Sequence, residues 1–266
     1  MNRSMVSFAR LCRAVFMVGV AALLGSLAVH AHAAAVIDWG SPQTVSGDSD
    51  IDTTGSFVYA FTFGGTSAPP STTVNGVTFS PFTIPSGIIT SATVGNVTIS
   101  ESPGNLFGIN SLGSVSAPFS GLSSGYQSLL GTGAYADVPE TITVTLNGLT
   151  VGQQYRIQWW TSDAARQRAP TGGVFSNTTA AAVNSVTLDA NTTDAVGGLG
   201  QFAIGTFTAS GATQPFTLAQ TGVVGGFSPL INALQVRAVP EPSTCASLLA
   251  GLACGGYSLF RRRCAR

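Results

Sequence analysis

The chain has 266 residues, of which 8% are charged. It has no lysine, and its 11 arginines balance its 11 acidic residues, so the formal net charge is zero. Between Ala33 and Cys245 the chain contains no Cys, His or Lys. A Ser-His-Asp triad, a cysteine nucleophile, a Schiff-base lysine, a P-loop and a zinc site of His or Cys ligands each need one of these residues, so the composition excludes them from this region.

Residues 1–33 have the features of a secretory signal peptide. Arg3, Arg10 and Arg13 precede an apolar run over residues 14–29, and Ala31-His32-Ala33 places small residues at positions −3 and −1. This order is typical of a signal peptide, and we expect cleavage after Ala33. The alternative is an uncleaved membrane anchor, which the run favours less because it is shorter than the ~20 residues of a spanning helix.

The next region, residues 34–238, has an apolar period of two, which indicates strands. Residues 141–146 alternate threonine with an aliphatic residue, as expected of a strand with one buried face. Comparable runs cover residues 57–63, 72–79, 88–94, 97–100, 154–161, 185–188, 202–208, 215–218 and 230–236. About ten short strands at this spacing predict an all-β domain, a two-sheet antiparallel sandwich of the jelly-roll type.

Turn residues separate the predicted strands. Asn75-Gly76 and Asn147-Gly148 have the composition of type I′ hairpin turns, in which both central residues need positive φ. Gly95-Asn96 is a weaker example of the same pattern.

The segment 149–155 resembles the tyrosine corner of Greek-key sandwiches, with Leu149, Gly152 and Tyr155 spaced three apart before an alternating strand. The resemblance implies that the Tyr155 hydroxyl ties the turn to the strand. The runs 156–163 and 231–237 resemble those of galactose-binding-like and carbohydrate-binding jelly rolls of exported bacterial proteins. That resemblance implies a sandwich fold and names no ligand.

Three carboxylates at alternate positions, Asp48, Asp50 and Asp52, form a weak candidate calcium site. Calcium takes six to eight oxygen ligands, so these acids and loop carbonyls could begin a site. The segment is not an EF-hand loop, since Tyr59 stands where the twelfth-position glutamate would be. The favoured alternative is a charged strand edge that deters edge-to-edge pairing, and we expect no cofactor.

Trp160 is the candidate glycan-binding residue. Alternate residues of a strand face opposite ways, so Trp159 is expected to point inward with Tyr155 and Ile157, and Trp160 outward. An exposed indole near Tyr126 or Tyr135 could stack on a sugar ring. The favoured alternative is partial burial under the loop of residues 164–173.

We expect no catalytic residue. Residues 121–125 match the serine-hydrolase pattern GxSxG, but Ser123 has no histidine to act as its base. A glycosidase or lyase using paired carboxylates is the alternative function, with acids available at Asp137, Glu140, Asp163, Asp189 and Asp194, none paired by spacing. Arg166 and Arg168 are expected to form an ion pair or a solvated loop rather than a site for anionic polysaccharide.

The C-terminal region, residues 239–266, has three parts in order. Pro240-Glu241-Pro242 precedes an apolar stretch over residues 245–260, which Arg261, Arg262 and Arg263 follow. As a helix this stretch would span ~24 Å, and the arginines would remain in the cytoplasm. The arrangement resembles the PEP-CTERM sorting signal of exosortase substrates in Gram-negative bacteria, in which the Pro-Glu-Pro element is recognised by a membrane transpeptidase. A simple tail anchor is the alternative.

These features predict an exported protein of the cell surface or extracellular matrix with a structural or adhesive role. Its partners would be an exosortase-type transpeptidase and extracellular polysaccharide, weakly bound, with transient inner-membrane anchoring through the C-terminal span. Nucleic acid is not expected as a partner because residues 34–239 have ten acidic residues against four arginines.

Overall fold

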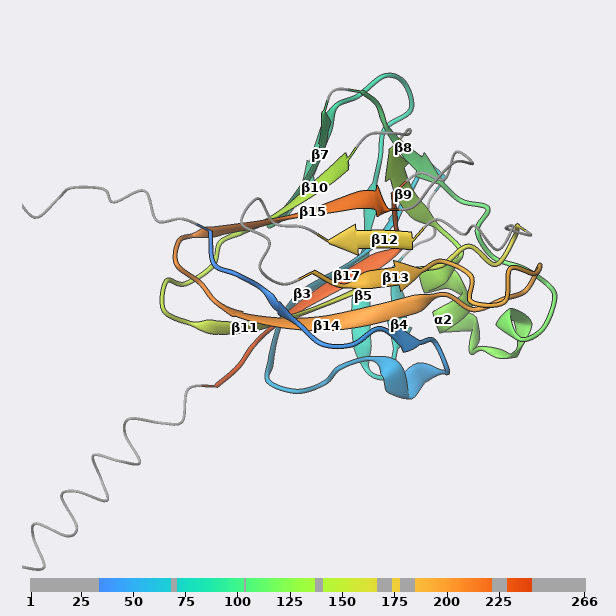
Figure 1. The fold of residues 1–266 in the computed structure, drawn as a ribbon, viewed down its shortest axis with the longest axis horizontal. Helices are drawn as coiled ribbons and strands as arrows, with labels where there is room; N and C mark the ends of the chain where they lie inside the picture. Colours follow the sequence, from blue (N-terminus) through green and yellow to red (C-terminus); the bar gives the residue numbers. More distant parts are fainter. Residues whose placement is uncertain are drawn as a thin grey trace, which may run out of the picture. The chain divides into compact units, whose positions relative to one another are not determined.

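The computed structural model describes residues 34–67, 71–102, 104–136, 141–166, 174–177, 185–221 and 229–240. The chain divides into two units, Met1–Ala33 and Ala34–Arg266, at the residue after which we expect cleavage. The described residues all belong to the second unit, and they are mainly strands with one short α-helix (Figure 1). The all-β prediction is thereby confirmed for this part of the chain.

Strands, an α-helix and two 3-10 helices follow one another along the described residues. In chain order they are β1 (Asp38–Trp39), β2 (Gln43–Thr44), η1 (Asp48–Asp50), β3 (Ser56–Gly64), β4 (Thr72–Val74), β5 (Val77–Thr83), β6 (Ser91–Val94), β7 (Val97–Ser102), β8 (Leu106–Ile109), η2 (Phe119–Gly121), α2 (Ser124–Leu130), β9 (Gly133–Ala136), β10 (Thr141–Asn147), β11 (Gln154–Thr161), β12 (Val174–Asn177), β13 (Thr187–Asp189), β14 (Gln201–Thr208), β15 (Thr213–Thr221), β16 (Leu230–Ile231) and β17 (Ala233–Ala238).

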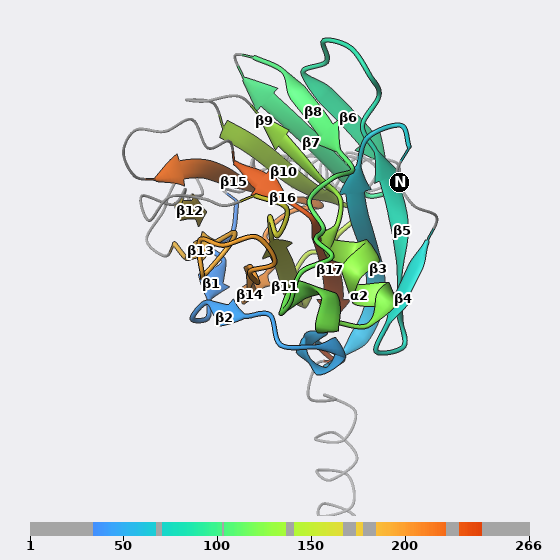
Figure 2. The ribbon, with the colours of Figure 1, turned by 90° about the vertical axis from the view of Figure 1, so that its right-hand side faces the viewer.

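The strands form three sheets. An eight-stranded sheet has the order β1-β14-β11-β17-β3-β5-β4, with β2 also paired to β14, and a six-stranded sheet has the order β13-β12-β15-β10-β7-β6. A three-stranded sheet, β16-β9-β8, is an addition to the two sheets expected (Figure 2). The pairs are antiparallel except that β3 and β5 run parallel. The arrangement is consistent with a β-sandwich.

Of two predicted hairpin turns, one forms the expected hairpin and the other does not. Asn75 and Gly76 both adopt positive φ, at 47° and 75°, and join β4 to its antiparallel neighbour β5, as the sequence predicts. Asn147-Gly148 does not make a hairpin, because β10 lies in the six-stranded sheet and the next strand, β11, lies in the eight-stranded one. This turn therefore carries the chain from one sheet to the other.

The main hydrophobic core joins the two large sheets. Ile142, Val144 and Leu146 of β10 are fully buried and belong to the same cluster as Ile157 and Trp159 of β11. Alternation along β10 explains this, since its threonines are only half-buried on the other face. A second cluster covers the opposite face of the eight-stranded sheet, where α2 contributes Tyr126, Leu129 and Leu130.

The predicted tyrosine corner is confirmed. The Tyr155 hydroxyl accepts a hydrogen bond of 2.9 Å from the Thr150 backbone N–H, and the Tyr155 ring, 4% exposed, stacks on Phe207. Gly152, which lies between Thr150 and Tyr155 in the chain, has a φ of 85°, which an L-residue rarely adopts. The corner fixes how the chain enters β11, the strand that carries most of the candidate residues considered next.

Candidate functional site

The three aspartates proposed for calcium do not converge. Asp48 accepts a hydrogen bond of 2.6 Å from the Ser123 hydroxyl, whereas Asp50 accepts bonds from the Ser46 N–H at 2.6 Å and the Gly47 N–H at 3.0 Å. In the residues that the structure describes, no group of three or more His, Cys, Asp or Glu residues could hold a metal ion. The favoured alternative, a charged strand edge, is also wrong, because Asp48–Asp50 form the 3-10 helix η1.

Asp52 forms an ion pair with Arg156 of β11. The Arg156 Nε lies 2.6 Å from the Asp52 Oδ2, and the Asp52 and Arg156 side chains are 7% and 26% exposed. Burial alone would raise the pKa of the Asp52 carboxyl, but the hydrogen bonds from Arg156 and Thr54 and the charge of Arg156 outweigh it, so this pKa lies below its ordinary value. Asp52 is therefore held in its charged form by the fold.

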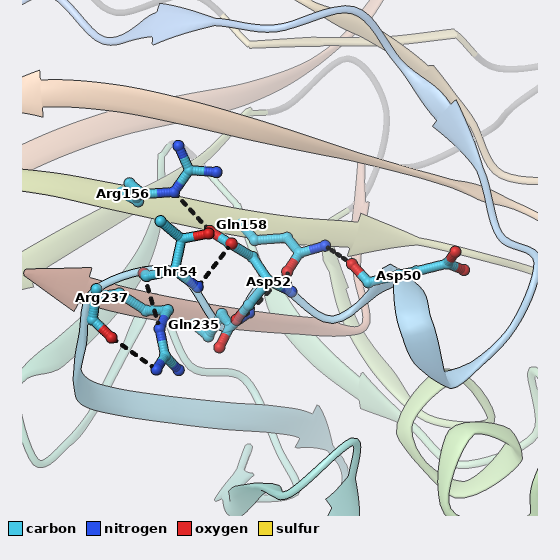
Figure 3. A network of polar contacts seen from close by, with 8 residues as sticks. Asp50, Asp52, Thr54, Arg156, Gln158, Gln235 and Arg237 are labelled. Carbon is cyan, nitrogen blue, oxygen red and sulfur yellow. Dashed lines mark hydrogen bonds and ion pairs between the residues drawn. The ribbon is translucent and has the colours of Figure 1, made fainter. Parts of the chain in front are cut away.

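Next to this ion pair, two glutamines bind the backbone of Asp50 and Asp52 (Figure 3). Gln158 of β11 donates to the Asp50 carbonyl at 2.7 Å and accepts from the Asp52 N–H at 2.9 Å. Gln235 of β17 donates to the Asp52 carbonyl at 2.9 Å and to the Gln158 Oε1 at 2.7 Å. Both glutamines are 1% exposed, so these bonds are shielded from water.

Arg237 extends the same network toward β3. Its guanidinium donates to the carbonyls of Thr54 and Gly55 at 3.0 and 2.9 Å. Residues 50–55, which we call the strap, are thus bound through their backbone by side chains of β11 and β17. Sequence analysis missed Gln158, Gln235 and Arg237 as a group, because no local pattern relates residues such as Gln158 and Gln235, which are 77 positions apart. Their polar groups hold the strap to the sheet.

Trp160 is buried, which corrects its assignment as an exposed glycan-binding residue. It does face the opposite way from Trp159, as strand parity predicts, yet both indoles are 0% exposed. Phe79 and Phe202 pack against the Trp160 ring, with centroids 5.7 and 6.2 Å away. The parity argument fails at its last step because α2 and neighbouring strands cover this face.

A hydrogen-bonded chain links Trp160 to η1 through α2. The indole Nε1 donates to the Tyr126 hydroxyl at 3.0 Å, and this hydroxyl donates to the Asp50 Oδ2 at 3.3 Å. Burial, with the nearby Asp50 charge, raises the pKa of Tyr126 above its ordinary value. Sequence analysis missed α2, although the spacing of Tyr126, Leu129 and Leu130 is typical of one buried helical face.

Ser123 of the GxSxG match begins this helix. Its Oγ accepts a hydrogen bond of 3.2 Å from the Tyr126 N–H, as an N-cap residue does, and also bonds Asp48. The Oγ is thus part of the link between α2 and η1. Ser124 and Gly125 of the same match already belong to α2, so the segment is not the Gly/Ser loop that the sequence suggests.

The carboxylates considered for a glycosidase are used separately where the structure describes them. Asp163 forms an ion pair of 2.8 Å with Arg166, as expected, and Asp189 accepts a hydrogen bond of 2.9 Å from the Asn191 N–H. Asp194 lies in a turn with a φ of 54°. Asp137, Glu140 and Arg168 lie outside the described residues.

An open depression lies beside the outward face of α2. Its volume is about 490 Å³, within the range of small-molecule sites. The polar side chains that line it are Asn110, Ser111, Ser114, Ser124, Gln127 and Ser128, none of which is charged. The sequence gives no local signal for this depression, because the loop after β8 and the helix α2 meet only in the fold.

The described residues end at Pro240, the first residue of the predicted sorting motif. Val239 is bound on both sides, since its N–H donates to the Gln154 carbonyl at 2.9 Å and its carbonyl accepts from the Gln153 Nε2 at 2.6 Å. Glu241, Pro242, Arg261, Arg262, Arg263 and residues 1–33 lie outside the described residues. Within the part that is described, no helix is long and apolar enough to cross a membrane.

No protein-family model matches the chain, and neither does any curated protein. Among solved structures, the enzymatically active domain of tailspike protein 4 of bacteriophage CBA120 is 14% identical with a TM-score of 0.32, over 55% of this chain and 20% of that chain. This chain therefore spans about a fifth of that one. A structure described under the promiscuous specificity of carbohydrate-binding modules of the β-sandwich superfamily is 15% identical with a TM-score of 0.25, over 77% of this chain and 96% of that one. Likenesses this low carry no argument for fold or function.

Proposed function

We propose that the chain is an exported structural or adhesive protein of the cell surface or extracellular matrix, directed there by residues 1–33 and processed by an exosortase-type transpeptidase at Pro240-Glu241-Pro242. The observation that carries the proposal is the C-terminal series of Pro-Glu-Pro, an apolar stretch and Arg261-Arg262-Arg263. The transpeptidase recognises the Pro-Glu-Pro element, and the apolar stretch holds the chain in the inner membrane until processing. The three arginines stop transfer of the chain across the membrane.

The place where the fold ends supports this division of the chain. Among the described residues β17 is the last strand, and Val239, which follows it, is hydrogen-bonded to Gln154 at the start of β11 and to Gln153 just before it. Pro240 comes next and is exposed. Processing at this motif would leave all of the described strands in one chain.

The acidic residues of η1 and the strap have partners within the fold. The carboxylates of Asp48, Asp50 and Asp52 bind a serine hydroxyl, backbone N–H groups and Arg156, respectively, and so hold η1 and the strap in place. We assign the two large sheets to the jelly-roll class and propose weak binding of extracellular polysaccharide, with neither metal nor catalytic carboxylates required.

The experiment compares the wild type with Glu241→Ala in a Gram-negative host that contains an exosortase. Cell fractionation and intact-chain mass spectrometry follow the location and length of the chain. We expect the wild type to lose the segment after the motif and leave the inner membrane, and Glu241→Ala to stay there at its longer mass. Glu140→Ala is the matched control and should be processed normally. If wild type and Glu241→Ala keep the same mass and fraction, the sorting proposal is wrong and a simple tail anchor replaces it.

A further inference from the structure

The depression beside α2 offers hydrogen-bonding groups that the fold leaves open. In the described part of the chain, the hydroxyls of Ser111, Ser124 and Ser128 make no hydrogen bond, and Ser111 and Ser124 are exposed. Asn110, which lines the depression, uses its Oδ1 to accept from the Gly65 N–H at 2.9 Å, and its amide N–H groups make no hydrogen bond within the described residues. A ligand with several hydroxyls would satisfy such groups.

Two of the polar side chains are also held in position. Gln127 donates from its Nε2 to the Leu122 carbonyl at 2.7 Å, which fixes the carboxamide and leaves its Oε1 as an acceptor. The Asn110 carboxamide is fixed by Gly65 in the same way. Ordered groups cost less conformational entropy when a ligand binds.

The depression has an apolar side as well. Val115 at its wall is 97% exposed, and the Phe119 ring, 2% exposed, lies behind it. Gly113 keeps the surface open next to this ring, because a Cβ there would lie 3.3 Å from the Phe119 Cε1. A sugar ring has both hydroxyls and apolar C–H faces, and this lining offers contacts to both.

The absence of charge in the lining distinguishes neutral from charged ligands that carry hydroxyl groups. The lining has no Asp, Glu, Lys or Arg side chain. A phosphate, a uronate or a cation needs a countercharge or many aligned donors to compensate its lost hydration. A neutral sugar needs neither, so it fits this lining best.

The depression also lies at the end of the eight-stranded sheet away from the C-terminal exit. Asn232, directly before β17, donates to the carbonyls of Leu130 and Thr132, both at 2.8 Å, and so holds Gly131 of the depression beside the start of β17. The exit follows Ala238, and a six-residue strand is about 20 Å long. Figure 1 shows α2 and the last residues of β17 at opposite ends of the sheet.

We propose that this depression binds a unit of a neutral polysaccharide, and that attachment through the C-terminus presents it to the surroundings. The binding site deepens the proposed function, because it names a ligand class and a position for the polysaccharide contact. The ligand would be one or two sugar residues long, bound weakly at each site as expected of an open surface.

The test uses the purified full chain in detergent with beads of dextran, xylan and β-glucan, and with polygalacturonate as a charged comparison. Hydrogen–deuterium exchange maps the contact. We expect retention on at least one neutral polysaccharide, protection of peptides within residues 110–131, and at least tenfold weaker binding by the Ser111→Ala/Ser128→Ala double variant. The matched control, Ser91→Ala/Thr93→Ala on β6, should bind as the wild type does.

The proposal would be overturned by no retention on any neutral bead, by equal retention on polygalacturonate, or by retention that the Ser111→Ala/Ser128→Ala variant leaves unchanged. Protection confined to residues outside 110–131 would also contradict it. The assay needs no processing of the chain, so binding without cleavage at the sorting motif would contradict only the proposed sorting. Cleavage without binding would contradict only the assignment of the depression.

Discussion

The Trp160 indole nitrogen lies 3.0 Å from the Tyr126 hydroxyl, and through this bond a strand of the eight-stranded sheet holds the short helix α2. Both residues are 0% exposed, so water cannot replace either partner. The same hydroxyl donates to the Asp50 carboxylate of η1. One phenol therefore joins three segments distant in sequence.

The first prediction concerns this phenol. Tyr126→Phe leaves the Trp160 N–H buried without an acceptor, so the free energy of unfolding should fall by about 1–3 kcal/mol. Urea unfolding followed by tryptophan fluorescence measures it. Tyr135→Phe is the matched control, since the Tyr135 hydroxyl makes no hydrogen bond within the described residues, and it should change stability by less than about 0.5 kcal/mol. Equal effects of the two changes would contradict a structural role for the Tyr126 hydroxyl.

The second prediction concerns the tyrosine corner. Tyr155→Phe removes the acceptor of the Thr150 N–H and keeps the ring that stacks on Phe207. We expect a loss of about 1–3 kcal/mol, because the hydroxyl is buried and its partner is a backbone donor. Thermal unfolding followed by circular dichroism tests this. A melting temperature equal to that of the wild type would show that the Tyr155 hydroxyl does not stabilise the fold.

The third prediction concerns acid. The pKa of Asp52 is lowered in the folded chain, so its contribution to stability is complete above the unfolded pKa of about 3.9 and disappears as pH falls through the lower folded value. Since Arg156 is partly exposed, screening limits this contribution to about 1 kcal/mol. Asp52→Asn should therefore be less stable than the wild type at pH 7 and approach it below pH 3.

Urea midpoints measured between pH 7 and pH 2.5 check this prediction. Asp194→Asn is the control, because it removes a carboxyl outside the strap and should leave the difference between pH 7 and pH 2.5 nearly as in the wild type. Parallel curves for the wild type and Asp52→Asn would show that the ion pair with Arg156 does not set the acid response.

The fourth prediction concerns Asn232. Its carboxamide, 0% exposed, donates to the carbonyls of Leu130, Thr132 and Ser162 and accepts from the Ser162 N–H at 2.6 Å. Asn232→Leu leaves these backbone groups buried and unpaired, so we expect a loss of roughly 3 kcal/mol or more. Asn232→Asp keeps the acceptor and should be less damaging when the new carboxyl is protonated. Chemical denaturation at pH 7 and pH 4 separates the two variants; a stable Asn232→Leu chain would contradict the assigned role.

Local patterns in the sequence predict some of these residues and not others. Tyr155 and the bounds of β11 follow from period-two alternation and a turn of a few residues, which are contained in one short segment. The burial of Trp160 does not, because alternation says only that it faces away from Trp159. What covers that face is decided by Tyr126 and by Phe79, 34 and 81 residues earlier in the chain.

The candidate site shows the same division. The alternation of acids at Asp48, Asp50 and Asp52 is visible in the sequence, but their different partners come from the N-cap of α2, from residues 46–47 and from β11, respectively. The depression beside α2 has no sequence signal, because uncharged Ser and Asn residues are common in loops and only the folded chain groups them. Polar residues of a β protein thus acquire their roles from strand neighbours that sequence separation conceals.

The position of β17 inside the eight-stranded sheet has a consequence for mechanical force. β17 lies between β11 and β3 and is antiparallel to both. Tension applied to the chain beyond Pro240 and resisted at the far end of the sheet acts along β17 and loads both ladders of hydrogen bonds in shear. Many bonds must then break together, whereas a terminal strand at a sheet edge peels away one bond at a time. We therefore expect the sandwich to withstand more force when it is pulled through its C-terminal end than it would if β17 were a strand at the sheet edge.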